Sequence, residues 1–348
     1  MSTVTIVGSG MMGSALCWPL TDNGHTVRLV GTPLDEGIIS SIRATGKHPR
    51  LQRQMPPGVE AYPVRSLAQA LHGANLVVNG VSSFGVDWFA QTAGPLLQPE
   101  VPVLSVTKGL VDQTNGNLQI LPHYIDQNLP PAQRGKISFN AIAGPCTSHE
   151  LAARRQTGVV FCGKDEGILW YLRGFFHNSY YHVWTSTDEV GVEVCAALKN
   201  AYALAVGLMV GAMEKDGPDG FALSYNPQAA VFAQGCYEMR RMLELLGGGV
   251  ENIYGLPGPG DLYVTIYGGR TVKLGKLIGL GNSYEKARRM LAGETLESVE
   301  ITTRVCRALP KLEARGLIQP KDFPLLRHLE GIIHRGEAVN IPWESFFA

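Results

Sequence analysis

The sequence predicts an α/β protein in which an N-terminal doubly wound parallel sheet, residues 1–187, precedes an all-helical C-terminal domain, residues 188–348. In the first half, short β-prone runs alternate with helical stretches, which is typical of a parallel sheet with helices on both faces. From Val190 onward the pattern changes to long helices with few β-branched runs. A length of 348 residues is sufficient for two domains with separate cores.

The β-prone runs of the first half define the order of the predicted sheet. Pro19 lies inside the first helical stretch, where its missing N–H should kink or shorten the helix. Residues 181–188 are the predicted boundary, and Thr187 or Asp188 is suited to cap the next helix. The predicted strands are residues 4–7, 26–30, 76–81, 102–106, 137–142 and 158–161.

The turn after the first β run has the spacing of a dinucleotide-binding loop. Residues 8–13 read Gly-Ser-Gly-Met-Met-Gly and open a helix. Glycines permit a tight turn and close approach of the backbone to a pyrophosphate, which the helix N-terminus then attracts. Because strand, glycines, helix and second strand follow in order, we predict a Rossmann-type domain. Its cofactor-binding residues are expected to include Gly8, Gly10, Met11, Met12 and Gly13.

The end of the second β run bears on the choice between NAD and NADP. NAD-specific sites usually carry Asp or Glu there, which holds the ribose 2′-hydroxyl. Here Gly-Thr-Pro follows Val30, and no acid occurs before Asp35. The missing carboxylate removes a repulsive element against a 2′-phosphate, and Thr32 could hydrogen-bond to one, although no arginine stands at this turn. The sequence therefore leans to tolerance of NADP.

Two later β runs end in loops that carry polar residues. Lys108 follows the fourth run, and residues 144–148, Gly-Pro-Cys-Thr-Ser, follow the fifth. An open α/β sheet binds ligands at the carboxyl ends of its strands, so both loops are expected at the binding edge. Thr147 and Ser148 can cap the following helix. Cys146 is interpreted as a small packing residue, because no histidine partner is evident near it.

A single lysine stands in a long apolar helix of the second half. Between Val190 and Met213 the only charged residues are Glu193 and Lys199. Residues three and four positions away share a helix face, which places small and aromatic side chains beside Lys199. Burial of an ammonium is costly and lowers its pKa toward the range in which it exchanges protons. The alternative is a lysine that extends to the surface; the polar neighbour Asn200 favours a functional one.

Two glycine-rich turns present charged side chains later in the chain. Residues 255–262 read Gly-Leu-Pro-Gly-Pro-Gly-Asp-Leu, a rigid turn that presents Asp261, whose simpler role would be a helix N-cap. Residues 268–271 read Gly-Gly-Arg-Thr and present Arg270 from flexible backbone. A guanidinium in that setting is suited to bidentate binding of a phosphate, and the alternative is a solvated surface arginine.

Composition and charge exclude several classes of partner. The 30 basic and 30 acidic residues balance, which gives no reason to expect nucleic acid or an acidic membrane. Six cysteines without a Cys-x-x-Cys pair and nine dispersed histidines predict no metal site. The thiol pattern and the lack of a basic-then-apolar leader point to the cytoplasm, and the near-zero charge is compatible with a homodimer. Polar residues near the middle of the apolar helix argue against a membrane span.

Taken together, these motifs resemble the NAD(P)-dependent glycerol-3-phosphate dehydrogenase family over nearly the whole chain. The resemblance includes Asn-Gly-His at residues 23–25 and His-Pro-Arg-Leu at residues 48–51. Several ordered motifs at these separations are far more specific than any one alone. They are GSGMMG at residues 8–13, TKGL at 107–110, AGP at 143–145, ALKNAYALAVG at 197–207, GLPGPGDL at 255–262 and GGR at 268–270.

The resemblance implies interconversion of dihydroxyacetone phosphate and sn-glycerol 3-phosphate with NAD or NADP, in glycerol and phospholipid metabolism. It implies that Lys199 is the general acid or base, with Lys108 and Asp261 completing the catalytic group. Lys108 would lower the pKa of Lys199 toward about 7–8, a useful range for a general acid, although Asp261 would oppose that shift. The implied substrate-binding residues are Lys108, Gly144, Cys146, Asn200, Thr265, Arg270 and Thr271. The implied cofactor-binding residues beyond the glycine turn are Thr32, Lys108, Ser148, Arg270 and Glu297.

Several positions depart from the family pattern, and they cluster at the substrate end. Thr271 stands where the family has Asn, Gln234 where it commonly has Arg, and Cys146 where it has a serine or alanine-like residue. These departures leave open a dehydrogenase of the same fold that acts on another polyol phosphate or a hydroxy acid. A catalytically silent nucleotide-binding sensor is a further alternative, which the retention of Lys199 and Asp261 disfavours.

Overall fold

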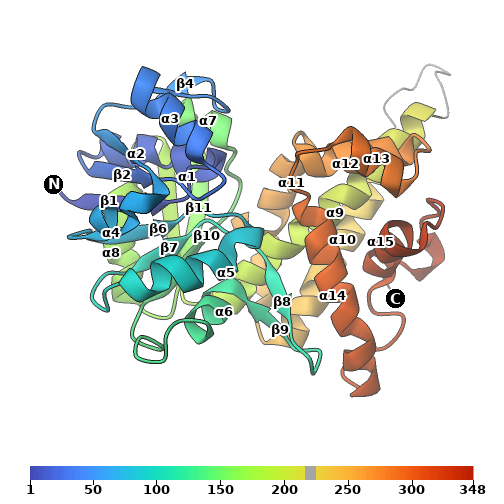
Figure 1. Ribbon diagram of the computed structural model, residues 1–348. Helices are drawn as coiled ribbons and strands as arrows, with labels where there is room; N and C mark the ends of the chain where they lie inside the picture. The colour runs from blue at the N-terminus through green and yellow to red at the C-terminus, as the bar shows by residue number, and fades with distance from the viewer. Residues whose placement is uncertain (216–224, 348) are drawn as a thin grey trace. The chain divides into compact units, whose positions relative to one another are not determined.

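The computed structural model describes residues 1–215 and 225–347, and the chain divides into two compact units. The first unit comprises residues 1–108 and 121–189, and the second comprises residues 109–120 and 190–348. The first is an α/β unit and the second is mainly helical (Figure 1). The predicted change at residue 188 lies next to the observed one at Glu189, but the short segment 109–120 joins the second unit.

An eight-stranded sheet forms the centre of the first unit, in the order β12-β11-β10-β7-β6-β1-β2-β5. The pairs from β10 to β5 are parallel, whereas β11 is antiparallel to β10 and parallel to β12. The chain order reverses beside β1, which is the switch point of a doubly wound sheet. The strands are β1 (Thr3–Val7), β2 (Thr26–Val30), β5 (Val59–Tyr62), β6 (Leu76–Asn79), β7 (Val103–Ser105), β10 (Phe139–Ala143), β11 (Thr157–Cys162) and β12 (Tyr181–Ser186).

Helices cover both faces of this sheet (Figure 1), as the sequence predicts. Every residue of the central strands β6, β7 and β10 is buried, and most of them are apolar, as expected for parallel strands covered on both faces. The helices of the unit are α1 (Met11–Ala15), α2 (Cys17–Asp22), α3 (Glu36–Thr45), α4 (Leu67–Leu71), α5 (Val86–Trp88), α6 (Leu121–Gln127), α7 (Ser148–Ala152) and α8 (Glu166–Phe176). A small hairpin of β3 (Lys47–His48) and β4 (Arg53–Gln54) is inserted between α3 and β5.

The sequence did not predict the two edge strands, β5 and β12. None of the four residues of β5 is buried, and β12 mixes buried with partly exposed positions, so neither has the fully buried pattern of a central strand. In β12 the side chain of Trp184 is 56% exposed. Because β12 occupies most of the predicted boundary segment 181–188, the helical unit starts only after it.

Pro19 shortens the first helix, as expected. The helical stretch is divided into α1 and α2 at Leu16, three residues before the proline. Proline has no N–H for the carbonyl of Ala15, four residues earlier, and its ring crowds that turn. The irregularity therefore leaves the N-terminal end of α1, next to the glycine turn, undisturbed.

The long apolar helix α9 (Glu189–Lys215) is the core of the second unit. It is long and apolar enough to cross a membrane, but 94% of its most apolar window is buried inside the protein, which is typical of a core helix. Its neighbours contribute most of the remaining buried apolar side chains. They are α10 (Tyr225–Leu246), α11 (Asp261–Ile266), α12 (Arg270–Gly279), α13 (Tyr284–Met290), α14 (Glu297–Ala314) and α15 (Pro324–Arg335).

Helices α9 and α12 cross at a contact formed by glycines. A Cβ on Gly207 of α9 would lie 2.7 Å from the Val272 carbonyl oxygen, and one on Gly275 of α12 would overlap the Leu204 carbonyl. Gly211 and Gly279, one turn further on, are equally enclosed. The four glycines bring the two backbones into direct contact and so fix the start of α12 relative to α9.

The second unit is not entirely helical, because residues 109–120 add a hairpin of β8 (Leu110–Asp112) and β9 (Leu118–Ile120). Helix α14 holds this hairpin through Arg307, whose Nη2 lies 2.9 Å from Asp112 Oδ1, and Arg304, which donates to the Leu110 carbonyl at 3.3 Å. These partners are distant in the sequence, so local patterns in residues 109–120 did not reveal the hairpin.

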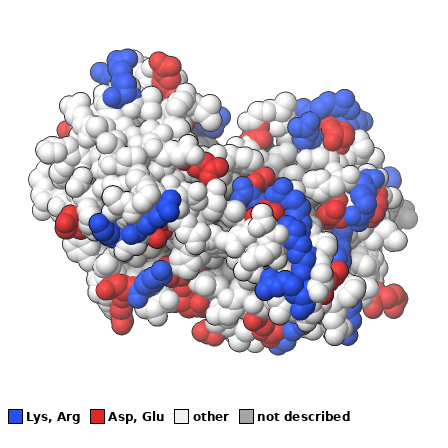
Figure 2. Space-filling model, turned by 60° about the horizontal axis from the view of Figure 1, so that its bottom comes forward, with Lys and Arg blue, Asp and Glu red and all other residues white. Residues whose placement is uncertain are grey.

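Basic and acidic side chains lie beside one another on the face drawn in Figure 2. Surface ion pairs of the described residues include Arg154 with Asp22 and Lys276 with Glu214, each 2.7 Å apart. The pattern agrees with the balanced composition of 30 basic and 30 acidic residues.

Candidate active site

The glycine turn after β1 has the backbone geometry that a pyrophosphate requires. Gly8 has φ +109°, and a Cβ on it would lie 2.7 Å from the Gly80 carbonyl carbon. A Cβ on Gly13 would lie 2.5 Å from the Gly8 carbonyl oxygen, whereas one on Gly10 would meet nothing within 4 Å. Packing thus requires the first and third glycines, and Gly10 faces open space through which a ligand can approach the backbone. The turn fits a dinucleotide.

The end of β2 has a carboxylate beside it, although no acid directly follows the strand in the sequence. The turn after Val30 folds back and brings Asp35 onto Thr32. Asp35 Oδ2 accepts from the Thr32 N–H at 2.9 Å, from Thr32 Oγ1 at 2.8 Å and from the Ser9 N–H at 3.1 Å. The Thr32 hydroxyl therefore donates to Asp35, which places an acid beside both the end of β2 and the glycine turn.

The loop that carries Lys108 is held at the same edge of the sheet. Lys108 follows β7, and its neighbour Thr107 is buried and donates from Oγ1 to the Val81 carbonyl at 2.7 Å. Asn79, at the end of β6, donates from Nδ2 to Ser105 Oγ at 3.1 Å. Hydrogen bonds between the ends of β6 and β7 thus fix the start of the Lys108 loop.

Residues 144–148 form the next loop along this edge, after β10. Gly144 has φ +120°, and Thr147 is the N-cap residue of α7, although its side chain makes no capping hydrogen bond. Ser148 is the first residue of that helix. Cys146 is half-buried and packs against the apolar core of the first unit, in agreement with the interpretation as a packing residue.

Lys199 of α9 forms a buried polar cluster with α11 in the second unit. Its side chain is nearly enclosed, and the residue is only 9% exposed. Nζ donates to Asp261 Oδ1 and to Thr265 Oγ1, each at 2.8 Å. Thr265 Oγ1 in turn donates to the Asp261 carbonyl at 2.6 Å. The structure thus brings three predicted site residues together and excludes the alternative of a lysine extended into solvent.

The cluster has the composition of a site that handles a proton. Asp261 is 2% exposed and compensates the charge of the buried ammonium, which would otherwise carry a large desolvation cost. Asp261 begins α11 directly after the rigid turn 256–260, so its carboxylate is aimed at Lys199 instead of capping its own helix. Asn200, adjacent on α9, is 7% exposed.

Arg270 and Thr271 are the first two residues of α12, where helix N–H groups favour an anion. Gly269, with φ +92°, precedes them, and a Cβ on it would meet nothing within 4 Å. Arg270 Nη2 lies 3.0 Å from Oε1 of Glu297, the first residue of α14. Thr271 is buried at 5% exposure. Two residues predicted to bind the cofactor, Arg270 and Glu297, are thus paired.

Gln234 belongs to a different buried cluster from the one around Lys199. Its Nε2 donates to Glu238 Oε1 at 3.0 Å, and its Oε1 accepts from the Phe347 N–H at 3.0 Å. Glu238 also accepts from the N–H groups of Leu325 and Leu326, at the start of α15. Gln234 therefore takes part in holding the C-terminal segment and the start of α15.

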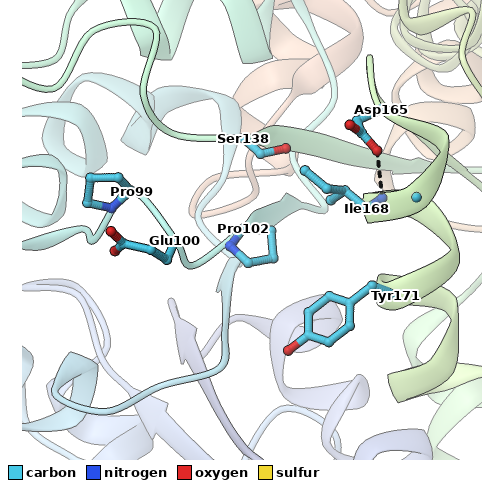
Figure 3. A pocket seen from close by; sticks show the side chains of 8 residues that line it. Pro99, Glu100, Pro102, Ser138, Asp165, Ile168 and Tyr171 are labelled. Atoms are coloured by element: carbon cyan, nitrogen blue, oxygen red, sulfur yellow. Dashed lines mark hydrogen bonds between the residues drawn. The ribbon is translucent and has the colours of Figure 1, made fainter.

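A cavity lies at another edge of the first unit (Figure 3). Its volume is about 290 Å³. Pro102 and Ser138 in its wall precede β7 and β10, so it lies at the opposite end of these strands from the glycine turn. Asp165 uses its carboxylate to cap α8 at the Ile168 N–H, 2.9 Å away. No group of three or more potential metal ligands occurs within residues 1–215 and 225–347.

Sequence reasoning missed two residues of the glycine turn's surroundings, Asp35 and His48. Asp35 lies five residues beyond the end of β2, and only the turn brings it back to Thr32. His48 Nε2 lies 3.1 Å from the Ser9 carbonyl oxygen, although 39 residues separate the two in the chain. The motif at residues 48–51 was noted, but no local pattern assigns it to the cofactor turn.

A doubly wound sheet with a dinucleotide turn, together with a helical unit that holds a buried lysine–carboxylate pair, defines the class of nicotinamide-dependent dehydrogenases. The family model of the NAD-dependent glycerol-3-phosphate dehydrogenase N-terminus matches residues 3–168, and that of the C-terminus matches residues 188–343. The chain belongs to the NAD-dependent glycerol-3-phosphate dehydrogenase family.

Relatives named as glycerol-3-phosphate dehydrogenases match over nearly their whole length. The chain is 35% identical to the NADP(+)-dependent glycerol-3-phosphate dehydrogenase of Archaeoglobus fulgidus, over 97% of this chain and 96% of that protein. It is 28% identical to the glycerol-3-phosphate dehydrogenase [NAD(P)+] of Shouchella clausii, over 97% and 93%. The crystal structure of glycerol-3-phosphate dehydrogenase from Coxiella burnetii is 25% identical, with a TM-score of 0.82 over 99% of this chain and 97% of that one.

Proposed function

We propose that the chain catalyses the NAD(P)-dependent interconversion of dihydroxyacetone phosphate and sn-glycerol 3-phosphate. The observation that carries this proposal is the pair of Lys199 and Asp261, an ammonium and a carboxylate buried together in the helical unit. A buried ion pair adds little to stability compared with apolar packing, so its presence in the core of α9 favours a chemical role. The family to which the chain belongs supplies the reaction class.

Lys199 is the proposed general acid and base. In the direction of reduction, a hydride adds to the ketone carbon, and the carbonyl oxygen takes a proton from Lys199 Nζ. When bound, the nicotinamide cofactor supplies that hydride, or accepts it in the reverse direction. Asp261 and Thr265 hold Nζ in place at 2.8 Å each. Asp261 stays ionised throughout and stabilises the ammonium from which the proton leaves.

Arg270 is proposed to bind the substrate phosphate at the start of α12, with Thr271 and Asn200 as further substrate contacts. A guanidinium has five N–H donors, so its pairing with Glu297 leaves others for phosphate oxygens. The N-terminal N–H groups of α12 add a favourable dipole for the same anion. Glu297 holds Arg270 in its orientation, and both keep their proposed contact with the cofactor.

The first unit is proposed to bind the cofactor through its glycine turn, at Gly8, Gly10, Met11, Met12 and Gly13. Thr32 and Asp35 are proposed to face the adenosine ribose, because both stand at the end of β2. The loops after β7 and β10 share this edge of the sheet. Lys108 is therefore proposed for catalysis and for binding of both ligands, Gly144 and Cys146 for substrate, and Ser148 for cofactor.

The alternative of another substrate loses one of its two supports. Gln234 donates to Glu238 and accepts from the Phe347 N–H, so a glutamine at this position has a structural role that requires no change of substrate. Thr271 remains as the departure at the phosphate end. The nucleotide sensor remains the less favoured alternative, because a sensor requires the glycine turn but not the buried Lys199–Asp261 pair.

The place and assembly of the enzyme are also proposed. A cytoplasmic homodimer, acting on a small phosphorylated substrate in glycerol and phospholipid metabolism, agrees with the balanced charge and with six cysteines that form no disulfide. Light scattering coupled to size-exclusion chromatography tests the dimer, for which a mass of twice 37.6 kDa is expected. A mass of 37.6 kDa would reject it.

The first experiment is the oxidation of NADH and of NADPH, followed by absorbance, after addition of dihydroxyacetone phosphate to the purified protein. We expect rapid turnover with at least one cofactor, and the ratio of the two rates gives the preference. Unphosphorylated dihydroxyacetone is the matched control, since it has the same ketone without the group that Arg270 binds. Equal turnover of the two ketones would contradict phosphate recognition, and cofactor binding without any turnover would favour the sensor.

A further inference from the structure

His48 is a fully buried histidine that reaches the cofactor turn from the inserted hairpin β3–β4. It is 0% exposed, and its ring joins two backbone groups. Nε2 lies 3.1 Å from the carbonyl oxygen of Ser9, the residue between Gly8 and Gly10. Nδ1 accepts from the Leu51 N–H at 3.0 Å. Both ring nitrogens are therefore engaged.

These two partners determine the tautomer and the charge of His48. A backbone N–H can only donate, so Nδ1 beside Leu51 carries no proton. A carbonyl oxygen can only accept, so Nε2 carries the hydrogen and donates it to Ser9. The ring is thus neutral, and a second proton on Nδ1 would oppose the Leu51 N–H.

Ser9 is held from both sides of its backbone. Its N–H donates to Asp35 Oδ2 at 3.1 Å, and its carbonyl accepts from His48 and from Ser14 Oγ, the latter at 3.2 Å. A trans peptide is planar, with its C=O and N–H pointing in opposite directions. Holding the Ser9 carbonyl toward His48 therefore turns the Gly10 N–H away from it. Gly10 is the glycine of the turn whose Cβ position is open.

We propose that His48 is a positioning residue for the cofactor, which sets the peptide between Ser9 and Gly10 so that the Gly10 N–H is presented to the pyrophosphate, and that protonation of His48 weakens cofactor binding. This inference rests on the proposed function only in placing the cofactor at the glycine turn. His48 itself acts through Ser9 and does not contact the cofactor.

The surroundings of His48 set the direction of the pH effect. Burial lowers the pKa of His48 below its usual value of 6.5, the hydrogen bond to Ser9 opposes this, Arg50 lowers the pKa further and Asp35 raises it. The ring is consequently neutral at and above pH 7 and gains its second proton only in acid. Cofactor affinity should therefore be constant above neutrality and should fall only in acid, below the usual histidine pKa of 6.5.

The test compares the Kd of NADH and NADPH for His48→Ala, His48→Gln and wild type, by fluorescence titration at pH 7.5 and pH 5.5. His48→Ala should weaken binding about fivefold to tenfold at pH 7.5, the loss of one hydrogen bond to the turn. His48→Gln can still donate from Nε2 to the Ser9 carbonyl, so its Kd should stay within about threefold of wild type. Because glutamine cannot be protonated in this pH range, the Kd of this variant should not rise further at pH 5.5.

Leu51→Ala is the matched control for packing. Leu51 is 2% exposed and lies in the same insertion, but its backbone N–H, and hence the hydrogen bond to His48, survives the substitution. If Leu51→Ala and His48→Ala weaken binding equally at similar losses of thermal stability, His48 acts only through packing and the proposal is wrong. If wild type and His48→Gln weaken equally in acid, the coupling to pH is wrong.

Failure of the proposed cofactor site gives a different result. A wild-type protein that binds neither NADH nor NADPH would reject the cofactor site itself. Tight binding by wild type, with an unchanged Kd in His48→Ala, would reject only the positioning role of the histidine.

Discussion

The two units contribute different kinds of groups to the proposed chemistry, backbone groups in the first unit and side chains in the second. In the first unit the binding surface is backbone: a glycine turn whose peptide groups are oriented by Asp35 and His48 from behind. In the second unit the proposed reactive groups are side chains, Lys199 and Asp261, buried among the helices. Substitution of the side chains that hold backbone groups should change ligand affinity only modestly. Substitution of one member of a buried ion pair leaves a buried charge uncompensated and should have a large effect.

The comparison predicts a hierarchy of sensitivities. Substitutions in the Lys199 cluster should abolish chemistry while leaving cofactor binding intact. Substitutions behind the glycine turn should change affinity and cofactor choice by factors below about tenfold. We expect the effects to decrease in that order, from the Lys199 cluster to the surroundings of the glycine turn.

Replacing Lys199 by Met should have the largest effect. The change removes the proton donor but keeps an unbranched side chain, and we expect kcat for dihydroxyacetone phosphate to fall about 10³-fold. The Kd of NADH should not change, since the glycine turn belongs to the first unit. Steady-state turnover and fluorescence titration measure the two quantities on the same preparation.

The Met variant leaves Asp261 buried without its cation, so folding needs its own control. Lys199→Met combined with Asp261→Asn removes both charges and should recover thermal stability without recovering turnover. A loss of turnover below about tenfold in the single variant, roughly 1.4 kcal/mol of barrier, would show that Lys199 is not the proton donor.

Gly275→Ala tests whether the crossing of α9 and α12 supports the site. The added Cβ would overlap the Leu204 carbonyl, so the helices must separate, at a cost of about 1–3 kcal/mol in the free energy of unfolding. Because Arg270 begins α12, the same shift should raise KM for the substrate more than it lowers kcat. Denaturant unfolding and steady-state kinetics give both values.

Gly174→Ala, in α8 of the first unit, is the matched helical control. A Cβ there would meet nothing within 4 Å, so alanine should stabilise the helix by about 0.5–1 kcal/mol. Equal behaviour of the two alanine variants would mean that the close helix crossing does not exist in solution.

The buried carboxyl of Glu238 predicts a pH dependence of stability in the helical unit. Burial raises the pKa of Glu238 to about 7, against hydrogen bonds from Gln234, Leu325, Leu326 and Tyr202 that lower it. The folded protein therefore holds a proton that the unfolded chain releases near its usual value of 4.5. This contribution is full below pH 4.5 and is lost as the pH rises to about 7, by about 1–3 kcal/mol.

Unfolding by urea at a series of pH values between 4.5 and 8 measures this slope. Glu238→Gln removes the titrating group and should flatten the profile between pH 4.5 and 7. A slope that persists unchanged in that variant would assign the dependence to other groups.

The sequence allowed much of the fold and the chemical groups of the site to be predicted, because both depend on local patterns. Glycines between a strand and a helix, and Lys199 alone in an apolar helix, are visible within a few residues. The glycine crossing was not predictable, because Gly207 packs against Val272 of another helix that is distant in the sequence. The contact of Gln234 with Phe347 was not predictable either, since 113 residues separate the two in the chain.

Asp35 is the residue whose role changed most between sequence and structure, and it gives the last and smallest prediction. Its carboxylate accepts from Thr32 and from the Ser9 N–H, at the position where a 2′-phosphate would be repelled. Asp35→Asn removes the charge but keeps an oxygen that can accept from Ser9. We expect the ratio of kcat/KM for NADPH to that for NADH to rise about fivefold, the effect of one partly exposed charge.

Glu36→Gln is the control, because it removes the charge of the next residue, an exposed carboxylate at the start of α3. If both variants shift the ratio equally, the effect is a general one of surface charge. If Asp35→Asn lowers kcat/KM for both cofactors equally, Asp35 supports only the shape of the glycine turn. In that case the tolerance of NADP expected from Thr32 would stand. A selective gain for NADPH would instead show that the charge of Asp35, beside the glycine turn, contributes to the choice between NAD and NADP.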